Sequence, residues 1–97
     1  MSPVESGTFR SASDMLQIIT PGAAAVAVTL KNPHSILNNT ANDGYVSMKL
    51  NGMSTYANVR IGAGAELVKE VVSVGPTADV TDAGKTAVTE LVVFGRN

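Results

Sequence analysis

The clearest pattern of hydrophobic and polar positions lies between residues 44 and 61. In the stretch VSMKL, which begins at Val46, apolar and polar side chains alternate. A period of two is typical of a half-buried β-strand, because successive side chains of a strand point to opposite faces. Asn51 and Gly52 follow, a dipeptide that readily takes the positive φ angles of a tight hairpin turn. The alternation then resumes as far as Ile61, so the pattern predicts a β-hairpin.

Further apolar runs bounded by turn residues predict the remaining strands. These runs are 15–20, 23–32, 65–75 and 86–94. Three alanines favour helix in the run 23–32, but its β-branched residues and the preceding Pro-Gly favour strand. Neither face of the run 65–75 is uniformly apolar, which predicts a bulge or kink near Glu70 that splits it into two short strands. We expect 15–20 and 86–94 to be edge strands that are available for pairing with a neighbour.

The segments between these runs have the composition of turns and loops. Residues 34–43 (HSILNNTAND) are rich in asparagine and predict a loop, which Ile36 and Leu37 attach either to the core or to a partner. Gly62 to Gly64 predicts a turn, and residues 77–85 predict a turn-rich connection.

About six or seven short strands, separated by turn signals roughly 8–12 residues apart, are typical of an antiparallel sandwich or barrel. The sequence of 97 residues therefore predicts one all-β domain over 15–97, a small antiparallel β-sandwich or jelly-roll-like fold. Residues 1–14 are polar and rich in serine, and they predict an extended N-terminal arm without a core of its own. This arm is either a frayed terminus or a segment that lies on a neighbouring subunit, with Phe9 and Arg10 as its anchors.

Composition and charge exclude several classes of function. The net charge is −1, from 7 basic and 8 acidic residues without a basic cluster, so a nucleic-acid partner is not expected. The absence of cysteine excludes disulfides and thiolate metal sites. The longest apolar stretch, 23–28, is too short to span a bilayer, so we expect no membrane partner. The N-terminus has Glu5 and no apolar region of the kind found in signal peptides, which indicates a protein made inside the cell and not exported by a cleavable signal.

Candidate chemistry is sparse. His34 is the single histidine, and a lone histidine beside a proline is more often a surface or capping residue than a catalyst. Asp79 and Asp82 supply too few oxygen ligands for calcium, and a turn or cap is the simpler interpretation. Asn38 begins a glycosylation sequon that we discount, since nothing indicates secretion. We therefore expect no catalytic residue, no cofactor, no metal site and no enzymatic activity.

The order of these segments resembles the small accessory structural proteins of tailed-bacteriophage virions, especially capsid decoration (cement) proteins. The resemblance covers residues 20–94 as a pattern of strands and turns. Its segments read AVAVTLKN, GYVSMKLNG, GAGAEL and VVSVGPTADVTDAGKTAVTELVVF. It implies a sandwich-like protomer, expected as a homotrimer, that is made in the bacterial cytoplasm and binds the major capsid protein on the outer capsid surface. The residues expected to contact the partner are Phe9 and Arg10 in the arm and Ile36 and Leu37 in the loop.

Two other classes of function stay open. The first is another virion component: a tail, connector or head-fibre protein. A tail or connector adaptor would assemble with six-fold or twelve-fold order instead of three-fold. A carbohydrate-binding β-sandwich would stack sugars on exposed aromatic side chains, and Tyr56 is the best candidate because it falls on the polar face of its strand. A cross-strand packing role for Tyr56 is the simpler alternative.

Overall fold

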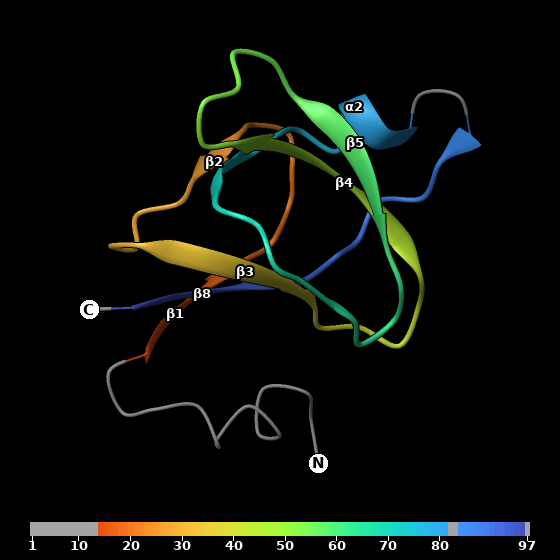
Figure 1. The fold of residues 1–97 in the computed structure, drawn as a ribbon. Coiled ribbons are helices and arrows are strands. Elements are labelled where there is room, and N and C mark those ends of the chain that lie inside the picture. The colour runs from red at the N-terminus through yellow and green to blue at the C-terminus, as the bar shows by residue number, and fades with distance from the viewer. Residues whose placement is uncertain (1–13, 82–83, 97) are drawn as a thin grey trace.

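The computed structural model describes residues 14–81 and 84–96, which form two four-stranded sheets packed face to face (Figure 1). Sheet A has the strand order β1-β8-β3-β6, and sheet B has the order β2-β7-β4-β5. Each pairing between these strands is antiparallel. The predicted all-β sandwich is confirmed. The predicted N-terminal arm lies outside the described residues, except for Asp14, which is the first residue of β1.

The last described strand of the chain lies in the middle of sheet A. Its strands are β1 (Asp14–Ile19), β3 (Pro33–Asn38), β6 (Glu66–Leu67) and β8 (Leu91–Arg96). The expectation that 86–94 forms an edge strand is therefore wrong, because β8 pairs with β1 on one side and with β3 on the other. Residues 86–88 lie along β4 instead, before the strand begins. The N–H of Tyr45 donates to the oxygen of Thr86 at 2.8 Å, and the N–H of Val88 donates to the oxygen of Tyr45 at 3.0 Å.

Sheet B contains the predicted hairpin. Its strands are β2 (Val26–Ala27), β4 (Gly44–Leu50), β5 (Ala57–Ile61) and β7 (Val71–Val74). The β4–β5 hairpin is confirmed, but its connection is longer than a two-residue turn, because pairing ends at Met48 opposite Ala57. A turn does form at Gly52, whose φ is 88°. The chain then needs several more residues before β5 begins. The strand predicted over 23–32 is also much shorter, since only two of its residues join the sheet.

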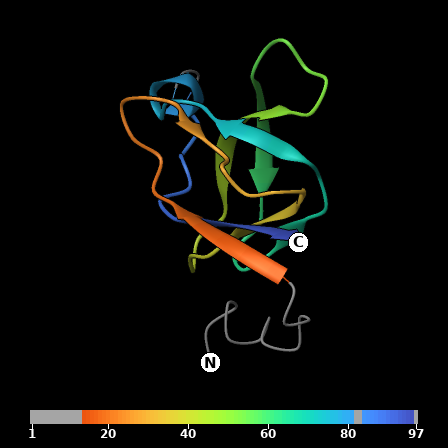
Figure 2. The ribbon, with the colours of Figure 1, turned by 90° about the vertical axis from the view of Figure 1, so that its left-hand side faces the viewer.

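The predicted division near Glu70 is confirmed. The strand on one side of it, β6, belongs to sheet A, and the strand on the other side, β7, belongs to sheet B. The chain therefore crosses from one layer to the other between these two strands (Figure 2). This crossing explains why neither face of the run 65–75 is uniformly apolar: the side that faces the core changes at the crossing.

The loop predicted over 34–43 is wrong in its first half, where β3 runs between β8 and β6. Residues 35–38 are all buried, so the segment has no alternation of apolar and polar side chains that could have indicated a strand. Ile36 faces the space between the sheets, whereas Leu37 faces the opposite side of sheet A. The register also shifts between Pro33 and Ser35, which leaves His34 as an extra residue in β3.

The core lies between the inner faces of the two sheets. It consists of buried aliphatic side chains and one methionine: Ile19, Ile36, Val46, Met48, Ile61, Val71, Val74, Val88, Leu91 and Val93. The short helix α2 (Ala78–Thr81) lies against the outer side of sheet B. There the amide of Asn58 donates to the main-chain oxygen of Asp79 at 3.0 Å. The outer side of sheet B is therefore partly covered by a described element.

Candidate interaction surface

The outer face of sheet A carries a cluster of apolar side chains. Residues opposite each other in neighbouring strands share a face, and the register places Leu16 opposite Phe94 and Ile18 opposite Val92. Leu37 lies opposite Val92 on the other side of β8. The core between the sheets contains four of the residues that alternate with these along the strands: Ile19, Ile36, Leu91 and Val93. These five side chains therefore point away from the core, and we call them the outer cluster.

The outer cluster is closed in its centre and open at its edge. Val92, Phe94 and Leu37 have exposed fractions of 0%, 2% and 4%, and they form a hydrophobic cluster separate from the main core. Leu16 and Ile18, on the edge strand β1, have exposed fractions of 48% and 59%. The centre of the outer cluster is therefore buried, whereas its edge on β1 is exposed.

Strand β1 is an apolar edge. On the side away from β8 it has no partner among the described strands. Met15 is about half exposed, as are Leu16 and Ile18. Between Met15 and Ile19 the strand has no charged residue, whereas natural edge strands usually carry charges, proline or bulges that prevent further pairing. Strand β1 is therefore the described segment best suited to contact another chain.

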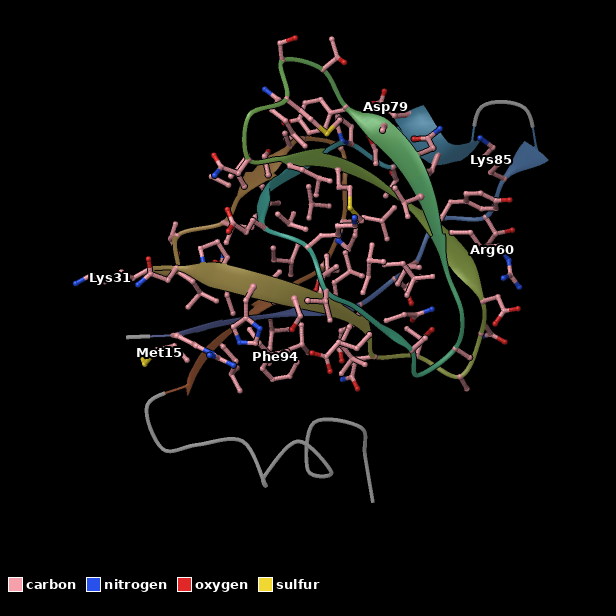
Figure 3. All side chains as sticks on the ribbon, in the orientation of Figure 1. Met15, Lys31, Arg60, Asp79, Lys85 and Phe94 are labelled. Atoms are coloured by element: carbon pink, nitrogen blue, oxygen red, sulfur yellow. The ribbon has the colours of Figure 1, made fainter. Side chains whose placement is uncertain are left out.

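The outer face of sheet B has the opposite character. Tyr45 and Arg60 lie opposite each other on it, and Arg60 forms an ion pair with Asp43. The Nζ atom of Lys85 lies 5.0 Å from the centroid of the Tyr45 ring. Figure 3 shows Arg60 and Lys85 far from Met15 and Phe94, which lie on sheet A. The molecule therefore has one polar outer face, on sheet B, and one outer face with an apolar cluster, on sheet A.

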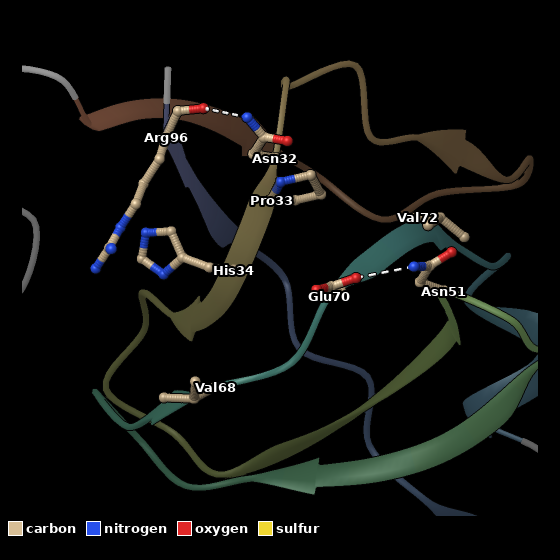
Figure 4. Close-up of a pocket in the computed structure, with 8 residues that line it drawn as sticks. All are labelled: Asn32, Pro33, His34, Asn51, Val68, Glu70, Val72 and Arg96. Carbon is tan, nitrogen blue, oxygen red and sulfur yellow. Dashed lines mark hydrogen bonds between the residues drawn. The ribbon is translucent and has the colours of Figure 1, made fainter.

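An open cleft of about 580 Å³ is lined by residues of β3, β8 and the segment that joins the two sheets (Figure 4). Its polar groups largely bond to one another. The amide of Asn51 donates to the carboxylate of Glu70 at 2.9 Å, and the amide of Asn32 donates to the oxygen of Arg96 at 3.3 Å. Within the described ranges, no group of three or more histidine, cysteine or acidic residues lies close enough to hold a metal ion. The cleft offers no set of converging groups that would define a reaction.

His34, at one side of this cleft, has a buried polar atom. Its ring is half-buried, and Figure 4 shows it beside the side chain of Arg96. The Nε2 atom is inaccessible to solvent, and no described group forms a hydrogen bond with it. His34 is therefore neither a freely exposed surface residue nor a fully paired core residue.

Tyr56, the candidate for stacking a sugar, is engaged within the molecule. Its hydroxyl lies 2.6 Å from Oγ of Ser73, and Nζ of Lys49 lies 4.9 Å from the centroid of its ring. The ring is half-buried, and a lysine cation occupies one of its faces. This arrangement fits the cross-strand packing role better than an open platform for a ligand.

Two other candidate positions have structural partners. Asn38, the first residue of the sequon, is fully buried, so its side chain is inaccessible to a modifying enzyme. The carboxylate of Asp79 accepts a long hydrogen bond from the hydroxyl of Ser47 at 3.4 Å. Asp82, the other half of the predicted acidic pair, lies outside the described residues.

Of the four residues that we expected to contact a partner, the structure describes two. Phe9 and Arg10 lie outside the described residues. Ile36 is fully buried between the sheets, and Leu37 belongs to the closed centre of the outer cluster. Of the two roles open to Ile36 and Leu37, attachment to the core is the one that this burial fits. Sequence reasoning missed Leu16 and Ile18, although the uncharged stretch MLQII was a signal that could have indicated them.

No helix in the described part of the chain is long and apolar enough to cross a membrane. No protein-family model, no curated protein and no solved structure matches this chain.

Proposed function

We propose that this protein is a structural component of a tailed-bacteriophage virion, a capsid decoration protein that binds the outer capsid surface and stabilises the coat lattice. Its partners are the major capsid protein and further copies of itself in a homotrimer, and it has no enzymatic activity. The observation that carries this proposal is the edge strand β1, with its three half-exposed apolar side chains and no charge between Met15 and Ile19. The resemblance of the order of strands and turns to decoration proteins supports the same assignment.

The edge strand supplies two kinds of contact. Its free main-chain groups can pair with an extended segment of another chain, and its apolar side chains add burial to that pairing. Each such contact is modest in area. A decoration protein that binds at many symmetry-related positions nevertheless gains strength from the number of linked contacts. An apolar edge on a small domain therefore fits a protein that works as an ordered array.

The alternative is a tail, connector or head-fibre component. A tail or connector protein would use the same edge strand in a ring of higher order. The number of subunits separates the two assignments. We therefore propose to measure the solution mass of the purified protein by light scattering. A mass near three times the 10.0 kDa chain supports the trimeric decoration protein, whereas a six-fold or larger ring supports the tail or connector.

The direct test adds the purified protein to heads of the phage that encodes it, after its own copy has been removed. We expect the protein to sediment with the heads and to raise the temperature at which they release DNA. A protein that stays in the supernatant at saturating concentration would refute the assignment, whatever its oligomeric state.

A further inference from the structure

We propose that Asn51 is a site of spontaneous modification. The main-chain nitrogen of Gly52 attacks the side-chain amide of Asn51, ammonia leaves, and Glu70 slows this reaction by holding the amide. The site lies in the connection between β4 and β5 of sheet B, whereas the edge strand β1 belongs to sheet A, and it does not depend on capsid binding. Three features point to it: the sequence, the geometry of the turn and the hydrogen bond between Asn51 and Glu70.

Asn51 and Gly52 are the two central residues of an exposed turn, and Asn51 is the only asparagine of the chain that glycine follows. The N–H of Met53 donates to the oxygen of Leu50 at 3.0 Å, which closes the turn around them. Gly52 has a φ of 88°, whereas Asn32 is the one residue other than glycine with a positive φ in the described part of the chain. This is the arrangement of a type II turn, in which glycine supplies the positive φ at the third position.

The nitrogen of Gly52 is available as a nucleophile. No group in the parts of the chain that the structure describes accepts a hydrogen bond from its N–H. A Cβ atom added at Gly52 would meet no atom beyond its chain neighbours within 4 Å, so the space around the residue is open. Because glycine has no Cβ atom, nothing on this residue hinders its approach to Cγ of Asn51. Both residues are exposed, so water reaches the site.

The reaction needs only water. Asparagine is one of the thermolabile residues of proteins. The nitrogen of Gly52 forms a bond to Cγ of Asn51 and gives up its proton, while the bond from Cγ to Nδ2 breaks and Nδ2 leaves as ammonia. The product is a cyclic imide, which water opens at either of its carbonyl carbons to give aspartate or isoaspartate. Water is consumed, ammonia is released, and no atom changes its oxidation state.

The hydrogen bond to Glu70 restrains the amide before it reacts. Nδ2 of Asn51 donates to the carboxylate of Glu70 at 2.9 Å, as Figure 4 shows. The main-chain N–H of Asn51 also donates to the main-chain oxygen of Glu70 at 2.9 Å. Closure of the imide ring requires the side chain to leave its staggered rotamer. A bond that fixes Nδ2 opposes this rotation, so Glu70 is a positioning residue that delays the reaction.

The product weakens the junction between β4 and the segment that crosses from sheet A. Loss of the amide removes the donor of the bond to Glu70 and places a second carboxylate beside the first. Like charges at this distance repel each other. Asn51 directly follows β4, and Glu70 directly precedes β7, so the repulsion acts where these two strands meet.

The test incubates the full chain at mildly alkaline pH and locates the products by peptide mapping with mass spectrometry. We expect Asn51 to lose its amide before any other asparagine, with aspartate and isoaspartate both formed, since the ring opens at either carbonyl. Asn42 and Asn58 are also exposed but precede aspartate and valine, which makes them internal controls. An equal rate at Asn42, or aspartate as the sole product, would overturn the proposal.

Variants of Glu70 test its role as a positioning residue. Glu70→Ala removes the acceptor and should speed the conversion of Asn51 by about threefold to tenfold, the factor that one modest hydrogen bond supplies. Glu70→Gln keeps an acceptor oxygen and should convert at nearly the natural rate. Asn42 and Asn58 should convert at unchanged rates in both variants, which separates this effect from a general loosening of the fold. A Glu70→Ala variant that is no faster, or a Glu70→Gln variant that is equally fast, would refute the role of Glu70.

Hydrogen exchange tests the effect of the product. Asn51→Asp imitates one of the two products. After correction for intrinsic rates, the main-chain N–H of residue 51 should exchange several-fold faster than in the natural chain, whereas that of Val46 within β4 should be unchanged. Equal protection of residue 51 in the two proteins would contradict the loosening of this junction.

Discussion

The side chain of Asn38 joins the two sheets, because its Nδ2 atom donates a hydrogen bond to the main-chain oxygen of Ile61 at 2.9 Å. Asn38 is the last residue of β3 in sheet A, and Ile61 is the last residue of β5 in sheet B. The same nitrogen donates to the oxygen of Asn42 at 2.9 Å, and Oδ1 accepts from the N–H and the hydroxyl of Thr40. This buried amide therefore uses its full hydrogen-bonding capacity.

Replacing Asn38 by alanine should lower the free energy of unfolding by about 2–3 kcal/mol, because it leaves buried carbonyl oxygens without their donor. Urea unfolding followed by circular dichroism measures the change. Asn42→Ala is the matched control, since Asn42 is exposed and its hydrogen bonds to Asn38 and Thr40 use its main-chain groups. We expect the control to change stability by less than about 0.5 kcal/mol. Similar losses in the two variants would show that the link between the sheets contributes little.

Gly95 in β8 should not tolerate a side chain. A Cβ atom at this position would lie 2.8 Å from the main-chain oxygen of Lys31, which cannot move aside as a flexible side chain would. Gly95→Ala should therefore destabilise the protein by about 1–3 kcal/mol. Gly22→Ala is the control, because a Cβ atom there meets no atom within 4 Å and should be neutral or stabilise by up to about 1 kcal/mol. Thermal unfolding of both variants measures the difference, and equal melting temperatures would contradict the predicted contact.

Asp43 and Arg60 form an exposed ion pair, but the two residues should contribute unequally. Arg60→Ala should cost about 0–0.5 kcal/mol, which salt should reduce further. Asp43→Ala should cost about 1 kcal/mol more, because Oδ1 of Asp43 also accepts a hydrogen bond from the N–H of Ala63 at 2.8 Å. Chemical unfolding at low and high salt tests both statements. A larger loss for Arg60→Ala than for Asp43→Ala would contradict this division.

Ile18→Lys should weaken self-association without unfolding the chain. A charge on an edge strand opposes pairing with a further strand, and Ile18 is the most exposed of the apolar side chains on β1. Light scattering should show a shift from oligomer to monomer, with a melting temperature measured at low concentration that stays nearly unchanged. Val68→Lys, at another exposed apolar side chain outside β1, should leave the oligomer intact. A shift caused equally by both variants would indicate a general effect of charge.

The parts of the fold that the sequence predicted are those with a local signal. The alternation around Val46 and Met48 indicated β4, because this strand has one apolar side and one largely polar side. The mixed faces around Glu70 indicated that one apolar run was two strands. Neither signal revealed that β6 and β7 belong to different sheets, since that depends on pairing with strands far away in the sequence.

The elements that sequence reasoning missed are those whose signals came from distant contacts. β3 is buried on both faces and ends in asparagine. Its polar residues Ser35 and Asn38 therefore made a central strand look like part of a polar loop. The side chains of these two residues form hydrogen bonds with groups that lie far away in the chain or in the next turn. Ser35, for example, donates to the carboxylate of Glu66 at 2.5 Å. The start of β8 was also misplaced, because residues 86–90 have the composition of a strand. Of these, 86–88 bond to β4 outside the sheet ladder, and the oxygen of Glu90 accepts from the N–H of Asn39.

The candidate interaction surface was predicted only in outline. The expectation of an edge strand at 15–20 is confirmed by β1, whereas Ile36 and Leu37 were chosen because they stood out as apolar residues in a polar segment. In a small sandwich, such residues mark the core more often than the surface. The uncharged stretch MLQII was a local signal for the exposed residues of β1, but their exposure itself depends on which strand ends a sheet.

The central position of β8 in sheet A has a consequence for synthesis. β1 and β3 emerge from the ribosome early, but they do not pair with each other, and the strand that joins them is made after residue 90. Until then the nascent chain holds two apolar strands without their common neighbour. Folds with many pairings between distant residues form slowly and expose their strands in the meantime. We therefore expect sheet A to assemble only after residues 91–96 have been translated, and we expect chaperones that hold extended apolar segments to protect β1 and β3 before that point.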